Sequence, residues 1–205
     1  MVGNLYLVST PIGNMGDITL RAIETLKNVD IVLAEDTRVT GKLLFNLDIK
    51  KPLISYHEHS SGKRHTDILE RIKSGENAAL CSDAGMPCIS DPGQQLVKDA
   101  IEEGITIIPI PGANAMLTGL IASGISTNCF TFMGFFPRKK REEEMRRVSS
   151  SLSTLVYYES PMRIVDAVTA IAQIMPEREI VIARELTKLH EEFIRGTTKD
   201  VLENL

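Results

Sequence analysis

Short apolar runs alternate with segments of helical periodicity along the first half of the chain. The runs are rich in Val, Ile, Leu and Ala, and polar or turn-forming residues follow each of them. They cover residues 5–9, 31–34, 53–56, 78–81 and 105–110. Short strands separated by helices favour a mostly parallel sheet flanked by helices, so the pattern predicts an α/β fold.

The second half of the chain continues this alternation. The predicted strands and helices cover, in order, residues 130–136, 140–150, 155–158, 161–175 and 180–183. Ser160 is the expected N-cap of the helix that begins with Pro161, because Ser is a favoured cap and Pro is favoured at the first helical position.

Residues 114–123 are apolar on nearly every side of a predicted helix, which is typical of a buried helix. We place a domain boundary here. The prediction is an N-terminal α/β domain over residues 1–113 and a C-terminal α/β domain over residues 114–205, each with a mostly parallel or mixed sheet. Residues 200–205 resemble a helix that is cut short, so we expect the second domain to be truncated at its carboxyl end.

An unusually long loop, CSDAGMPCISDPG, occupies residues 81–93 between a predicted strand and helix. Such connections usually span about 2–6 residues, and ligands of open α/β sheets bind outside the carboxyl ends of strands. The loop is therefore a candidate ligand wall. Asp91 is expected to be only the N-cap of the next helix, with Pro92 at its first position.

Composition narrows the class of protein. The 205 residues are 43% hydrophobic and 24% charged with a net charge of −4, so any nucleic-acid contact requires a local basic patch. The three cysteines form no CxxC pair, and His57-Glu58-His59 lacks the spacing of a zinc site, so no metal is expected. We see no signal peptide or bilayer-spanning run, and we expect a cytoplasmic protein without membrane contact.

Seven motifs occur in one order along nearly the whole chain. They are LVSTPIGN (7–14), AEDTR (34–38), HEH (57–59), SDAGMPCISDPG (82–93), PIPGANA (109–115), YYESPMR (157–163) and ARELTK (183–188). Together they closely resemble the small-subunit ribosomal RNA ribose 2′-O-methyltransferases of the tetrapyrrole methylase superfamily. Met86 and Cys88 depart from that pattern, where threonine and leucine are more usual.

This resemblance implies a homodimer of two-domain subunits, with S-adenosylmethionine bound in a cleft between the two α/β domains. It also implies transfer of a methyl group to the ribose 2′-hydroxyl of a cytidine in small-subunit ribosomal RNA. The residues that the resemblance assigns to the methyl donor are Pro11, Ile12, Gly13, Asp83, Gly85, Met86, Asn114, Ala115, Tyr158 and Ala183.

Methyl transfer to a ribose hydroxyl benefits from a base or a polarising cation beside a well-placed nucleophile. The candidates for this catalytic role are Glu35, Asp36 and Lys188. Cations beside Phe135 and Phe136 are typical of RNA-binding surfaces. The residues expected to contact RNA are Arg38, His57, His59, Arg138, Lys139, Lys140 and Arg163.

Three other functions stay open at this point. A relative in the same superfamily could methylate a porphyrinoid carbon or a modified histidine, although the resemblance gives such relatives neither the EDTR nor the HEH motif. The chain could also be a non-catalytic RNA-binding module. A nucleotide hydrolase is disfavoured because the sequence has neither a P-loop nor a cluster of metal-binding carboxylates.

Overall fold

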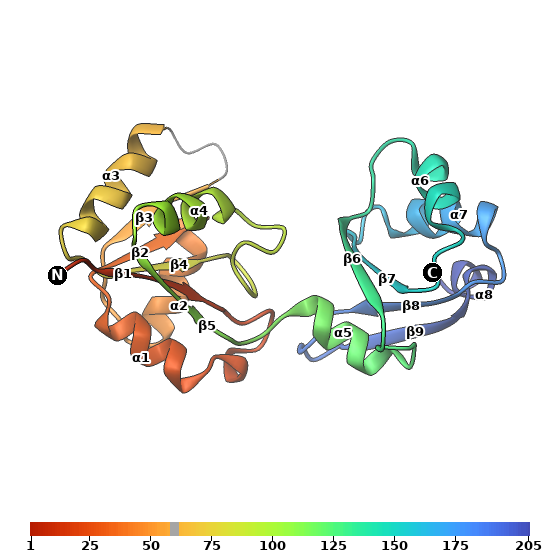
Figure 1. Ribbon diagram of the computed structural model, residues 1–205. Helices are drawn as coiled ribbons and strands as arrows, with labels where there is room; N and C mark the ends of the chain where they lie inside the picture. Colours follow the sequence, from red (N-terminus) through yellow and green to blue (C-terminus); the bar gives the residue numbers. More distant parts are fainter. Residues whose placement is uncertain (58–61) are drawn as a thin grey trace. The chain divides into compact units, whose positions relative to one another are not determined.

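A computed structural model describes residues 1–57 and 62–205, and its chain divides into two compact units. Unit 1 is Met1–Asn114 and unit 2 is Ala115–Leu205. Each unit is described by itself below, with the helices and strands labelled as in Figure 1.

Unit 1 contains a five-stranded sheet in which every pair of neighbouring strands is parallel. The strands are β1 (Asn4–Val8), β2 (Ile31–Ala34), β3 (Leu53–Ser55), β4 (Ala78–Cys81) and β5 (Thr106–Ile110). Their order in the sheet is β3-β2-β4-β1-β5. The apolar runs of the sequence form these strands, and the predicted α/β fold is confirmed.

Helices cover both faces of this sheet (Figure 1). They are α1 (Leu20–Asn28), α2 (Thr37–Asn46), α3 (Gly62–Lys73) and α4 (Gln94–Glu102), with a short 3₁₀ turn, η1, at Met15–Asp17. Residues of α3 and α4 pack with Leu5, Leu33 and Leu80 on one face. Residues of α1 and α2 pack with Val8 and Val32 on the other. Strand side chains alternate between the faces, so these short strands contribute to both cores.

The predicted N-cap of α4 is wrong. The residue before the helix is Gly93, with φ +132°, and Asp91 lies farther back in the loop. An added Cβ at Gly93 would lie 2.5 Å from Leu80 Cδ2 and 2.8 Å from Cys88 Sγ. The chain passes so close to β4 at this point that only glycine fits where the helix begins. Since Asp91 does not cap the helix, its carboxylate is available for another role.

Gly93→Ala is expected to destabilise the protein by about 2–3 kcal/mol, because it combines an unfavourable backbone conformation with crowding of a packed core. Urea unfolding measures the loss. Gly104→Ala is a matched control, because Gly104 has φ +72° with nothing within 4 Å of an added Cβ. We expect only about 1 kcal/mol there. Equal losses at both positions would contradict crowding as the cause.

Unit 2 contains two separate strand pairs. Strands β6 (Phe130–Phe135) and β7 (Thr154–Tyr158) are parallel, whereas β8 (Glu179–Arg184) and β9 (Glu192–Thr197) are antiparallel. The helices are α5 (Ala115–Ser123), α6 (Arg141–Val148), α7 (Ile164–Ile174) and α8 (Thr198–Glu203). A small core of Phe136, Met145, Val148 and Ala167 joins α6 and α7 to the end of β6.

Two local predictions for unit 2 are wrong. Helix α7 begins at Ile164 with Arg163 at the N-cap, and the Ser160 hydroxyl instead accepts a hydrogen bond from Arg163 Nε at 3.1 Å. Helix α5 is not buried on every side, since Ile121 is 75% exposed while Leu120 is buried. Some apolar side chains of α5, such as Ile121, therefore stay exposed in the folded chain.

Candidate functional site

The carboxyl ends of β1 and β4 meet where the sheet changes its direction of winding. The two strands are neighbours, yet α1 follows β1 on one face and α4 follows β4 on the other. Crevices form at such points because the two following loops diverge, and ligands of α/β sheets bind there. The loops after β1 and β4 are the ones that carry the TPIGN and SDAGMP motifs.

Hydrogen bonds join these two loops into one platform. Thr10 and Gly85 form an isolated antiparallel bridge, with N–H···O distances of 2.9 and 3.0 Å. The Thr10 hydroxyl also donates to the Ser82 carbonyl oxygen at 3.2 Å, and both Thr10 and Ser82 are buried. The platform is therefore held in place before any ligand arrives.

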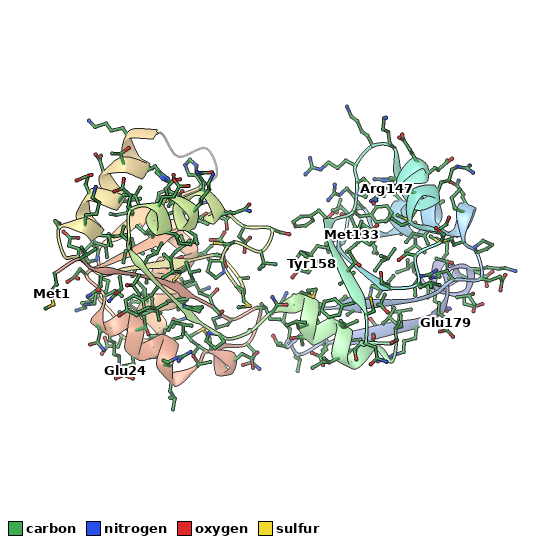
Figure 2. The ribbon with its side chains drawn as sticks, in the orientation of Figure 1. Met1, Glu24, Met133, Arg147, Tyr158 and Glu179 are labelled. Atoms are coloured by element: carbon green, nitrogen blue, oxygen red, sulfur yellow. The ribbon has the colours of Figure 1, made fainter. Side chains whose placement is uncertain are left out.

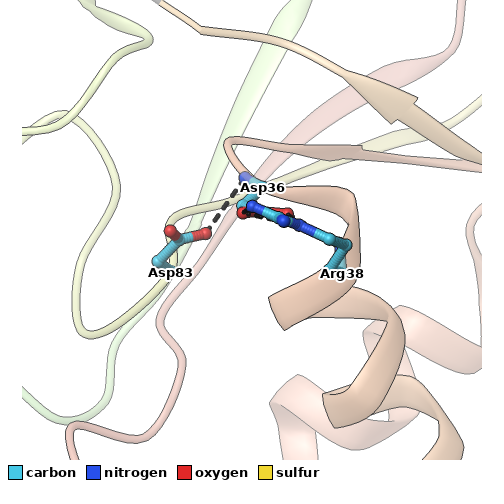
Figure 3. Close-up of polar contacts among 3 residues, drawn as sticks. All are labelled: Asp36, Arg38 and Asp83. Atoms are coloured by element: carbon cyan, nitrogen blue, oxygen red, sulfur yellow. Dashed lines mark hydrogen bonds and ion pairs between the residues drawn. The ribbon is translucent and has the colours of Figure 1, made fainter.

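The loop after β2 joins the same platform through Asp83 (Figure 3). Asp83 Oδ1 accepts a hydrogen bond from the Asp36 backbone N–H at 3.0 Å. The Asp36 carboxylate caps α2 by accepting from the Arg38 backbone N–H at 2.8 Å, and it also holds the Arg38 guanidinium at 2.6 Å. These bonds with Arg38 hold the pKa of Asp36 down to about 2. Arg38 itself remains 89% exposed at this edge.

Three carboxylates influence one another at this edge: Glu35, Asp83 and Asp91. Burial raises the pKa of Glu35, and the charge of Asp83 adds to the effect, while a hydrogen bond from the Asp83 backbone opposes it. Burial also raises the pKa of Asp91 to about 6, with further increases from Glu35 and Asp83 that a hydrogen bond with Ser82 partly offsets. The platform therefore carries concentrated negative charge, which favours a cationic ligand.

Glycine and strained backbone shape the same loops. Gly85 has φ +87°, and an added Cβ there would lie 3.3 Å from Ile12 Cγ2 and 3.6 Å from the Ala113 carbonyl oxygen. Cys88 and Ser90 hold positive φ angles of 70° and 60° without being glycine. Such conformations cost free energy and cluster at binding sites, where the surrounding structure enforces them.

The residues present fit S-adenosylmethionine, which carries a sulfonium and an ammonium group. Partly buried carboxylates complement those charges, and the side-chain-free surface at Gly85 allows a ligand to approach the backbone. Three donor-site predictions fall on the loop after β1 (Pro11, Ile12, Gly13) and three on the loop after β4 (Asp83, Gly85, Met86). Asn114 lies beyond the neighbouring strand β5 and is buried.

The other predicted donor residues belong to unit 2. Ala115 begins α5, Tyr158 ends β7 (Figure 2) and Ala183 lies in β8. The Tyr158 hydroxyl accepts a hydrogen bond from the Met116 backbone N–H at 3.2 Å. Its ring lies edge-on to Phe132 and Phe135, with centroids 4.9 and 5.7 Å away.

The remaining predicted residues are placed as follows. His57 follows β3 at the carboxyl edge of the sheet, and His59 lies outside the described residues. Arg138, Lys139 and Lys140 form the exposed segment before α6. Arg163 pairs with the nearly buried Glu159 at 2.6 Å. Lys188 pairs with Glu185 at 3.0 Å after β8.

Sequence reasoning missed Asp91 as a member of the acidic group, because its position before a helix favoured a capping role. The available signal was the repetition of Ser-Asp within one loop, at Ser82-Asp83 and Ser90-Asp91. Two Ser-Asp pairs that fold back toward one strand end bring their carboxylates close together.

Among residues 1–57 and 62–205, no group of three or more His, Cys, Asp or Glu side chains is placed to hold a metal ion. Within the same ranges, no helix combines the length and apolar character needed to cross a membrane.

Comparison with known proteins places this architecture in a family. Residues 4–202 match the family model described as Tetrapyrrole (Corrin/Porphyrin) Methylases. The chain belongs to the tetrapyrrole methylase family. This confirms the superfamily resemblance inferred from the seven motifs.

Two relatives of high sequence identity specify which members of this family the chain resembles. A Bacillus subtilis (strain 168) protein named Ribosomal RNA small subunit methyltransferase I is 51% identical over 203 residues, which are 98% of this chain and 70% of that protein. A protein of the same name from Halalkalibacterium halodurans is 50% identical, over 98% of this chain and 70% of that protein. The predicted resemblance to small-subunit ribosomal RNA methyltransferases is thus confirmed.

A solved structure of another protein shares the fold. Uroporphyrin-III C-methyltransferase from Thermus thermophilus, complexed with S-adenyl homocysteine, matches with a TM-score of 0.66 at 17% identity. The match covers 98% of this chain and 91% of that protein.

Proposed function

We propose that this protein transfers a methyl group from S-adenosylmethionine to the ribose 2′-hydroxyl of a cytidine in small-subunit ribosomal RNA. The observation that carries the proposal is the acid-lined platform of joined loops at the carboxyl ends of β1 and β4, in a chain about half identical to proteins named as small-subunit ribosomal RNA methyltransferases. That identity also favours RNA over a porphyrinoid substrate, because the porphyrin-modifying neighbour shares only 17% of residues.

S-adenosylmethionine supplies an electrophilic methyl group when it is bound. The chain's own residues then orient the donor and exclude competing water. We assign Asp83 to orienting the donor, because its carboxylate complements positive charge and ties the loop after β2 to the loop after β4. We assign Gly85 and the residues of the TPIGN motif to backbone contact with the donor.

Of the three catalytic candidates, Glu35 is best suited to accept the proton of the ribose hydroxyl. Its raised pKa makes it a stronger base than an ordinary carboxylate. Asp36 is a weaker base, since its pKa of about 2 reflects its bonds to Arg38. Lys188 is assigned to polarise the nucleophile or stabilise negative charge.

Arg38→Ala is expected to leave donor affinity unchanged and to lower kcat/KM for small ribosomal subunits about 5–10-fold, equivalent to about 1–1.4 kcal/mol. The reason is that the exposed Arg38 guanidinium presents a cation to RNA at the edge where the donor loops meet. Calorimetry measures donor binding, and labelled methyl transfer measures kcat/KM.

Lys42→Ala on the same helix is the control for a lost positive charge, because Lys42 is also exposed. We expect its kcat/KM to stay near that of the unmodified protein. A collapse of donor affinity in Arg38→Ala would instead place Arg38 in the donor site.

The proposal also includes a cytoplasmic homodimer, as the family resemblance implies. Light scattering of the purified protein measures its mass directly. The reaction class is tested by incubating the protein with labelled S-adenosylmethionine and either small ribosomal subunits or a porphyrinogen. Label in the subunits alone supports the proposal, whereas label in the porphyrinogen contradicts it.

A further inference from the structure

The segment before α6, the start of α6 and one side of α7 border an open hollow in unit 2, with a volume of about 490 Å³. Three of its lining residues are cations, namely Arg138, Lys140 and Arg141, and two are acids, namely Glu142 and Asp166. The hollow therefore has a formal excess of one positive charge on a chain whose net charge is −4.

Arg141 fixes the wall of this hollow. Its Nε donates to the Pro137 carbonyl oxygen at 3.2 Å, and its Nη1 lies 3.1 Å from Asp166 Oδ2 on α7. The Arg141 side chain is only 22% exposed. The ion pair neutralises Asp166, and because a guanidinium has five N–H donors, others on Arg141 stay available to a ligand.

Among the three cations that line the hollow, Arg138 has no hydrogen-bond or ion-pair partner in the described part of the chain. Arg138 is also exposed. Lys140 pairs with Glu143 at 3.1 Å, but both side chains are more than two-thirds exposed, so this pair is weak and exchangeable. A planar guanidinium beside a mobile ammonium suits a phosphate group, which accepts forked hydrogen bonds.

The lining also indicates which part of a nucleic acid would enter. Thr169 and Gln173 supply neutral polar groups, and no aromatic ring is among the lining residues. Bases are bound by stacking on rings or through edge contacts, whereas backbone contacts need cations and neutral donors. The chemistry of the hollow thus matches a phosphodiester and its sugars rather than a base.

We propose that this hollow binds a phosphodiester of the RNA backbone and anchors the substrate without reading its sequence. The inference rests on the proposed function, because it identifies where unit 2 contacts the same RNA. The inference assigns phosphate binding to Arg138 and Lys140, which line the hollow, and not to Lys139, which does not line it.

Arg138→Ala tests the proposal against Lys199→Ala, which removes an exposed charge of unit 2 from outside the hollow. We expect Arg138→Ala to raise KM for small ribosomal subunits about 5–10-fold with kcat within twofold. Its slope of log affinity against log salt should shrink by about one. Lys199→Ala should change both quantities much less. Equal losses in the two variants would overturn the proposal, since they indicate diffuse attraction.

Filter binding of a small-subunit RNA fragment at several salt concentrations gives the same comparison without catalysis. If the unmodified protein transfers no methyl group, the proposed function fails, and the two variants still decide whether the hollow holds RNA. If transfer occurs but Arg138→Ala binds RNA as tightly as the unmodified protein, only the inference about the hollow fails.

Discussion

Asp83→Ala is expected to weaken S-adenosylmethionine binding at least tenfold. The change removes a carboxylate that complements the positive donor, and it leaves the Asp36 backbone N–H without its acceptor at 3.0 Å. Hydrogen bonds to charged groups contribute about 1.5–3 kcal/mol, and a tenfold change in affinity corresponds to about 1.4 kcal/mol. Isothermal titration calorimetry of the purified variant measures the loss.

Asp83→Asn separates the two contributions. Asparagine keeps an oxygen that can accept from the Asp36 N–H but lacks the negative charge. If the lost negative charge accounts for most of the weaker binding, Asp83→Asn should lose nearly as much donor affinity as Asp83→Ala. Circular dichroism and thermal unfolding establish that both variants fold. A folded Asp83→Ala variant with unchanged donor affinity would refute the assignment of Asp83 to the donor site.

Donor affinity is expected to fall up to about tenfold when the pH is lowered from 7 to 5. The pKa of Asp91 is raised to about 6 by burial and by Glu35 and Asp83. A cationic donor favours the ionised carboxylate, so binding lowers this pKa and releases a proton. Affinity is therefore highest above pH 6 and decreases below it, by at most one power of ten per pH unit for a single proton.

Asp91→Asn is expected to flatten this dependence between pH 5 and 7, which calorimetry at matched ionic strength measures. An unchanged pH profile in Asp91→Asn would exclude Asp91 as its source.

The pH dependence of folding stability gives an independent check of the raised pKa of Asp91. The carboxyl ionises near 3.8 in the unfolded chain and near 6 in the fold, so the native state binds more protons in that window. Stability conferred by Asp91 is thus lost as the pH rises from about 4 to 6.

The sequence predicted the strands of unit 1 and the residues that end them. Each strand is a short apolar run with polar residues directly after it, and the carboxyl ends of parallel strands share one edge of a sheet. The pattern therefore predicts the ligand loop that carries Asp83, whereas the family resemblance assigns Glu35 and the TPIGN residues to the site. Motif order then supplied the family, because spacing alone gave only two α/β halves with a ligand loop.

The order of the strands could not be predicted. Placement of β4 between β1 and β2 depends on tertiary packing of helices against both faces, and no local pattern records it. The bond between Thr10 and Gly85 follows from that order, since it joins loops 75 residues apart in sequence. The helix that follows Asp91 starts later than predicted for a related reason, because the close approach of Gly93 to Leu80 at the N-cap is a tertiary contact that no local pattern records.

The central claim is that the chain methylates a ribose hydroxyl of small-subunit ribosomal RNA. The most direct test is transfer of labelled methyl from S-adenosylmethionine to small ribosomal subunits that lack the modification, followed by digestion to nucleosides and chromatography. The account predicts label in 2′-O-methylcytidine, in proportion to enzyme and strongly reduced with Asp83→Ala at a donor concentration near the Kd of the unmodified protein. Label on a base, or no label from a folded protein that binds the donor, would contradict it.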